Sequence, residues 1–143
     1  MAGWNTILVG MDGSPTSRAA LRWAADEAEQ HGAEVKAMMA WAPVLPPVSV
    51  SGAAPRDIPA HPREVAADEL VRTITDELGE NPPVRVQPVV KEGNPAKVLI
   101  EASTDADLLV VGSRGYGGFA GLLLGSVSQQ VAAHAECTVV VVR

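Results

Sequence analysis

The sequence has little cysteine and no long hydrophobic run. A single cysteine in 143 residues leaves no disulfide within the chain and is typical of a reducing compartment. No apolar run approaches the ~18 residues that a membrane span needs. The first residues also lack the basic segment and apolar stretch of a secretory signal. These absences predict a cytoplasmic protein with no membrane partner.

Basic residues are also scarce. The chain carries 11 Lys and Arg against 17 Asp and Glu, a formal net charge of -6. Because affinity for nucleic acid comes largely from Lys and Arg on phosphates, this balance excludes a general nucleic-acid binder. The length suits one domain, residues 1–143, with its own core. Cys137 adjoins a valine run and is expected to be a small buried apolar residue instead of a reactive thiol.

Apolar, β-branched runs alternate along the chain with segments of helical spacing, which is the pattern of βαβ units. The expected strands are residues 6–9, 35–40, 84–90, 108–111 and 138–142. The expected helices are residues 15–31, 62–78, 95–104 and 126–134. Ser14-Pro15 and Asn94-Pro95 are helix-start signals. In the second helix the expected buried residues are Ala67, Leu70, Val71, Ile74 and Leu78.

Proline marks two further features. Its density between residues 42 and 61 excludes a helix or a central strand there, so this segment is either a lid or partly disordered. Pro88 within the third strand indicates an edge of the sheet.

The connections between strands are long enough for helical crossovers, which predicts an α/β fold: a three-layer sandwich with a five-stranded parallel sheet of order 3-2-1-4-5 and four helices. In that order the first and fourth strands lie side by side where the winding reverses, and ligands of open α/β sheets bind beside such a point. The loops 10–14 and 112–126 are therefore expected to meet there.

The glycine-rich loop 112–126 can be compared with known phosphate-binding motifs. It contains no lysine, which excludes a Walker A loop. The segment 115–120 matches the dinucleotide pattern Gly-x-Gly-x-x-Gly/Ala literally, but it begins beyond the strand end and no later strand presents an acidic ribose ligand. We interpret that match as coincidence.

A third pattern fits the loop: Gly112, Gly115, nine intervening residues, and then Gly125-Ser126. Together with Val9-Gly10-Met11-Asp12-Gly13-Ser14 and Leu122-Leu123-Leu124-Gly125-Ser126-Val127-Ser128, it resembles the nucleotide-binding motif of the universal stress protein family, in its single-domain, ATP-binding branch. The resemblance covers essentially the whole chain. It implies a stress-response regulator that binds ATP or another adenine nucleotide, cyclic AMP included, with Mg²⁺ carried by the nucleotide.

The resemblance and the motif spacing name a set of nucleotide-binding residues: Gly10, Asp12, Ala40, Gly112, Ser113, Arg114, Gly115, Gly125, Ser126, Val127 and Ser128. Gly112 and Gly115 can adopt positive φ and let the loop approach the phosphates closely, and Gly10 would leave room for the nucleotide. The residues from Ser126 begin a helix whose free N–H groups would face an anion.

Two of these residues carry alternatives. Arg114, the one cation of the loop, either contacts phosphate or faces solvent. Asp12 is either a turn residue ahead of Ser14 or, by the resemblance, a ligand of ribose hydroxyls or of nucleotide-bound metal. The resemblance places adenine near the backbone of Ala40.

No general base and no lysine accompany the glycine loop, so no catalytic residue is expected and the chain is read as a regulator. A slow metal-dependent ATPase, with Asp12 holding the metal, is one alternative. A nucleotide-independent interaction module is another. The valine strand 138–142 would lie at a sheet edge, which predicts a homodimer through that strand.

Overall fold

The protein is described by a computed structural model covering residues 3–43, 60–115 and 124–143. Its elements are β1 (Thr6–Met11), α1 (Pro15–His31), β2 (Glu34–Trp41), α2 (Pro62–Leu78), β3 (Val86–Glu92), α3 (Pro95–Ser103), β4 (Leu108–Gly112), α4 (Ser126–His134) and β5 (Thr138–Val142). Most of segment 42–61, for which a lid or partial disorder was predicted, lies outside the described residues. Most of the dinucleotide-like segment 115–120 also lies outside them.

All strand pairs are parallel, and the sheet order is β3-β2-β1-β4-β5. The predicted α/β fold and strand order are confirmed. β1 is central: Ile7 is in register with Val35 of β2 on one side and with Leu108 of β4 on the other. β1 and β4 therefore adjoin at the point where the winding direction reverses.

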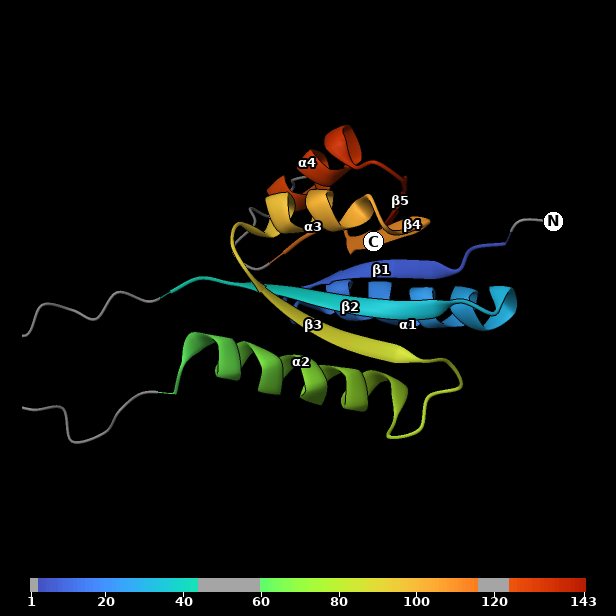
Figure 1. The fold of residues 1–143 in the computed structure, drawn as a ribbon, viewed down its shortest axis with the longest axis horizontal. Coiled ribbons are helices and arrows are strands. Elements are labelled where there is room, and N and C mark those ends of the chain that lie inside the picture. The colour runs from blue at the N-terminus through green and yellow to red at the C-terminus, as the bar shows by residue number, and fades with distance from the viewer. Residues whose placement is uncertain (1–2, 44–59, 116–123) are drawn as a thin grey trace, which may run out of the picture.

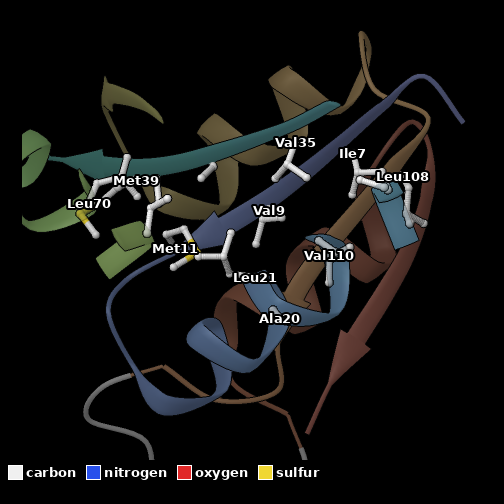
Figure 2. Packing of buried hydrophobic residues seen from close by; sticks show 14 of the residues in the cluster. Ile7, Val9, Met11, Ala20, Leu21, Val35, Met39, Leu70, Leu108 and Val110 are labelled. Atoms are coloured by element: carbon white, nitrogen blue, oxygen red, sulfur yellow. The ribbon is translucent and has the colours of Figure 1, made fainter. Parts of the chain in front are cut away.

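Helices cover both faces of the sheet, with α3 and α4 on one side and α1 and α2 on the other (Figure 1). Successive side chains of β1 alternate between the two faces, as the pleat of a strand requires. Ile7 and Val9 pack toward α1, and Figure 2 shows Val9 near Leu21 and Ile7 beside Leu108. Leu8 joins the second cluster with Leu99 of α3.

The structure differs from the prediction in the bounds of several strands and in the buried face of α2. β3 runs from Val86 to Glu92, two residues later than residues 84–90, because β2 continues to Trp41 and pairs with β3 along that length. Its edge position agrees with Pro88. On α2 the expected burial of Val71 is wrong, since its side chain is 50% exposed, and Ala66 and Thr73 are buried instead.

α2 covers β2 and β3 at one edge of the sheet and also contacts α1, so the residues that face these elements are the buried ones. Ala67 and Leu78 are half-buried at the margins of that buried face, while Leu70 and Ile74 lie in the core as expected. Among the helices in the described ranges, none has the length and apolar character needed to cross a membrane.

An ion pair joins α1 to α2. The Glu77 carboxylate accepts a hydrogen bond from Arg18 at 3.2 Å and also pairs with Arg22. The hydrogen bond from Arg22 does most to hold the pKa of Glu77 below its ordinary value. Burial opposes it, and the hydrogen bond from Arg18 and the charges of both arginines add to the lowering. The α1 helix is thus anchored to its neighbour at the end of α2.

Candidate functional site

A pocket of about 430 Å³ opens at the carboxyl ends of the central strands. It is lined by the ends of β1, β2 and β4 and by the first turns of α1, α3 and α4: Gly10, Met11, Asp12, Ser14, Ser17, Met38, Ala40, Pro95, Val98, Leu99, Val111, Gly112, Arg114, Gly115, Gly125, Ser126, Val127 and Ser128. The loops after β1 and β4 meet there, as the strand order predicts.

Every predicted site residue except Ser113 lines this pocket. Ser113 is buried, and its N–H donates to the carbonyl of Val142 at 2.7 Å. Its carbonyl accepts from the N–H of Gly125 at 2.6 Å. Ser113 therefore joins the loop to β5 and to the start of α4 from behind the pocket wall.

The N-terminus of α4 faces the pocket without a side-chain cap. Gly125 is the N-cap residue, and the first backbone bond of the helix runs from Gln129 to the Gly125 carbonyl at 3.0 Å. The N–H groups of Ser126 and Val127 precede that bond and have no carbonyl within the helix to reach. Such an end carries a partial positive charge, so it suits an anion.

Gly112 and Gly115 do not use the positive φ that is open to glycine. The described glycines with positive φ are Gly13, Gly32, Gly79 and Gly93. Close approach explains the loop glycines instead: a Cβ on Gly112 would lie 2.6 Å from the carbonyl carbon of Thr16, and one on Gly115 would lie 2.7 Å from Oδ2 of Asp12.

Both carboxylate oxygens of Asp12 have defined neighbours. Oδ1 accepts from the N–H of Ser14 at 2.8 Å, which makes the turn into α1. Oδ2 lies next to Gly115, on the side of the glycine loop. The turn alternative is therefore present in the structure, and the ligand alternative stays a prediction. Among the described residues of the lining, Asp12 and Arg114 are the charged ones, one of each sign.

Sequence reasoning missed the apolar side of the pocket. Met38, Val98, Leu99 and Val111 are each at most 7% exposed and line it. The space that Gly10 was expected to leave for a ligand is taken by Leu99, whose Cδ1 would lie 2.7 Å from a Cβ there. The helix-start signal Asn94-Pro95 marks this wall, because a helix that follows a parallel strand begins at the carboxyl edge of the sheet.

Two residues at the far end of the sheet take no part in the pocket. Asp107 accepts hydrogen bonds from the N–H groups of Thr6 and Asn5, and these bonds lower its pKa. Cys137 is half-buried, and desolvation by burial, followed by the charge of Asp107, raises the pKa of its thiol. A raised pKa leaves little thiolate, which agrees with the prediction of an unreactive cysteine.

The sequence is similar to that of known proteins over nearly its full length. The model of the universal stress protein family matches residues 3–143. A universal stress protein of Mycobacterium tuberculosis is 41% identical over 141 residues, and one of Mycolicibacterium smegmatis is 37% identical over 139 residues. Both alignments cover 96% of this chain, which spans about 45% of the length of either relative.

Solved structures share the fold. A universal stress protein from Lactobacillus plantarum has a TM-score of 0.73 at 22% identity, with both chains covered completely. A universal stress protein in complex with cAMP has a TM-score of 0.67 at 26% identity, covering 99% of this chain and 98% of that one. One from Arabidopsis thaliana with AMP bound has a TM-score of 0.60 at 19% identity, with coverages of 96% and 90%. This chain belongs to the universal stress protein family.

Proposed function

We propose that this domain binds an adenine nucleotide, ATP with its Mg²⁺ in particular, and acts as a nucleotide-responsive regulator in a stress response. The observation that carries the proposal is the uncapped N-terminus of α4, which faces a pocket that apolar side chains also line. The start of α4 suits phosphate, and the apolar side chains suit a base.

The expected binding energies support a phosphate site at α4 and an apolar site for the base. Hydrogen bonds to a charged group contribute about 1.5 to 3 kcal/mol each. Two or three such bonds from the first turn of α4 therefore supply much of the roughly 8 kcal/mol of a micromolar complex. The buried side chains of Met38 and Leu99 offer an aromatic base an apolar surface, and Ala40 lies at the end of β2 beside them.

The comparisons support the class of ligand. The solved relative with cAMP and the one with AMP both hold adenine nucleotides. Within the described ranges no group of three or more His, Cys, Asp or Glu side chains gathers to hold a metal. We therefore infer that Mg²⁺ arrives with the nucleotide and that Asp12 acts on it, or on the ribose hydroxyls, through Oδ2.

Calorimetric titration of the purified chain tests the proposal, with ATP, AMP and cAMP each measured with and without Mg²⁺. We expect micromolar affinity for ATP that improves with Mg²⁺. No heat of binding with any of the three nucleotides would contradict it, and a preference for AMP or cAMP would replace ATP as the ligand.

A slow metal-dependent ATPase is the second candidate, favoured by the position of Asp12 Oδ2 against the glycine loop. Steady phosphate release that Asp12→Asn abolishes supports it, whereas release no faster than in buffer dismisses it. A third possibility, the interaction module, gains support if partner capture is indifferent to nucleotide.

We also propose that the chain forms a homodimer through β5, whose edge position and valine run favour pairing with a second copy. A monomer in equilibrium sedimentation at micromolar concentration would contradict this. A cytoplasmic location, inferred from the cysteine content, belongs to the same proposal and is tested by fractionation of cells that express the protein.

A further inference from the structure

The first turn of α1 holds the glycine loop through Thr16, a residue that does not line the pocket. The hydroxyl of Thr16 donates to the carbonyl of Arg114 and accepts from the N–H of Arg114 at 3.3 Å. One side chain thus binds both backbone polar groups of Arg114, which lies 98 positions away in the sequence. The hydroxyl of Ser14 donates to the same carbonyl at 3.3 Å.

The contact extends to the neighbouring backbone. A Cβ on Gly112 would lie 2.6 Å from the carbonyl carbon of Thr16 and 2.7 Å from the N–H nitrogen of Ser17. Only glycine allows the end of β4 to approach α1 this closely. The first glycine of the motif therefore serves the contact with Thr16, and its conformation is an ordinary one.

The other side of Arg114 faces α4. A Cβ on Gly125 would lie 3.5 Å from the Cα of Arg114 and 3.4 Å from the N–H nitrogen of Gly115, both ordinary contact distances. The backbone of Arg114 is thus packed between the first turn of α1 and the uncapped start of α4. A shift of Arg114 would change the opening between the loop and the N–H groups of α4.

We infer that Thr16 is a positioning residue: its hydroxyl fixes the backbone of Arg114 and so sets the spacing between the glycine loop and the anion-binding end of α4. The inference rests on the proposed function, because the spacing matters only for a ligand held there. Neither the motif nor the resemblance points to Thr16. It acts through Arg114 and touches no ligand itself.

Thr16→Val and Thr16→Ser separate the hydroxyl from the shape of the side chain. Valine keeps the branched shape and loses both hydrogen bonds, whereas serine keeps the hydroxyl. We expect Thr16→Val to weaken ATP binding about tenfold in calorimetry, the effect of losing roughly one hydrogen bond's contribution. Thr16→Ser should stay within about twofold of the wild type.

Thr75→Val is the matched control. The hydroxyl of Thr75 donates to the carbonyl of Val71 at 3.0 Å on the exposed side of α2, far from the pocket. Equal losses of affinity in Thr75→Val and Thr16→Val would overturn the inference. If Thr16→Val does not fold, as judged by its melting curve, Thr16→Ala carries the same expectation.

Hydrogen exchange of the Arg114 amide tests the contact without any ligand. We expect protection in the wild type and in Thr16→Ser, and faster exchange in Thr16→Val. Two results would overturn the role of Thr16 and leave the proposed function standing. One is an unprotected Arg114 amide in the wild type, and the other is an ATP affinity of Thr16→Val within twofold of the wild type. A wild type that binds no nucleotide overturns the proposed function, and with it the purpose of the spacing.

Discussion

Of the three helices that begin at the pocket, α1 and α4 differ in how their first turns are capped. At α1 the Ser14 side chain accepts from the N–H of Ser17 at 3.3 Å, and Asp12 accepts from the N–H of Ser14. The hydroxyl of Ser17 donates back to the Ser14 carbonyl at 2.9 Å. At α4 the N-cap is Gly125, which offers no side-chain acceptor.

This difference separates a structural helix start from a binding one. A capped helix end has satisfied its own donors and holds its neighbours in place, as α1 holds Asp12 and Arg114. An uncapped end that is kept in position by other contacts retains its donors for a ligand. For α4 those contacts come from Ser113 and from Ser128, whose hydroxyl donates to the Gly112 carbonyl at 3.0 Å.

A side-chain cap on α4 should remove its difference from α1 and give the largest loss of ATP affinity. In Gly125→Asp the new carboxylate accepts from the first turn of the helix and places a negative charge where phosphate would bind. We expect ATP affinity to fall by about a hundredfold, while the free energy of unfolding rises by a few tenths of a kcal/mol, roughly the gain of Asp over Gly at an N-cap. Calorimetry and urea titration measure the two effects.

Gly125→Asn is the control for that experiment, because it caps without a charge. The site has room for either side chain, since a Cβ would make only ordinary contacts at 3.4 and 3.5 Å. We expect Asn to weaken binding by much less than Asp. Equal affinities of Gly125→Asp and the wild type would show that no anion binds at this helix end.

Gly112→Ala should damage the fold first. Its Cβ would meet the backbone of α1, which cannot shift without breaking the capped turn. Overpacking of this kind costs about 1 to 3 kcal/mol. Gly125→Ala, in contrast, should cost no more than about 0.5 kcal/mol. Urea titrations of the two variants compare them, and similar costs would mean that the loop does not depend on α1.

Ser14→Ala should lower the free energy of unfolding by about 1 kcal/mol, because it removes the cap of α1. Asn94→Ala is a matched variant: the Asn94 side chain accepts from the N–H of Lys97 at 3.2 Å and caps α3. Both should lose similar stability, but only Ser14→Ala should also weaken ATP binding, since Ser14 contacts Arg114. An unchanged ATP affinity in Ser14→Ala would separate the α1 cap from the site.

The smallest expected effect on stability comes from the ion pair of Glu77 with Arg18 and Arg22, which joins α1 to α2. The pKa of Glu77 is lowered in the folded protein, so its stabilisation is present above its ordinary value of 4.5 and is lost as the pH falls through the folded value. Glu77→Gln should cost at most about 1 kcal/mol near pH 7, because solvent screens the arginines. Denaturation measurements should show a smaller cost at pH 3 than at pH 7. A cost that is the same at both values would contradict the ion pair's role.

Much of the fold follows from local signals. Ser14-Pro15 and Asn94-Pro95 each start a helix in the structure, and residues 126–134 and 138–142 form the predicted elements with unchanged bounds. The pattern of Gly112, Gly115 and Gly125 located one wall of the pocket. It did not explain its own glycines, because the reason at Gly112 is a contact with Thr16 and Ser17 of α1, far earlier in the chain.

The sequence by itself determined the element order, the parallel sheet and the strand ends at which the pocket lies, because periodicity, capping residues and crossover length are properties of short segments. Only the tertiary structure decided which face of α2 is buried, that Leu99 occupies the space above Gly10, and that Thr16 holds Arg114. These are contacts between segments far apart in the chain. Their distances depend on how the helices pack on the sheet, which no local pattern records.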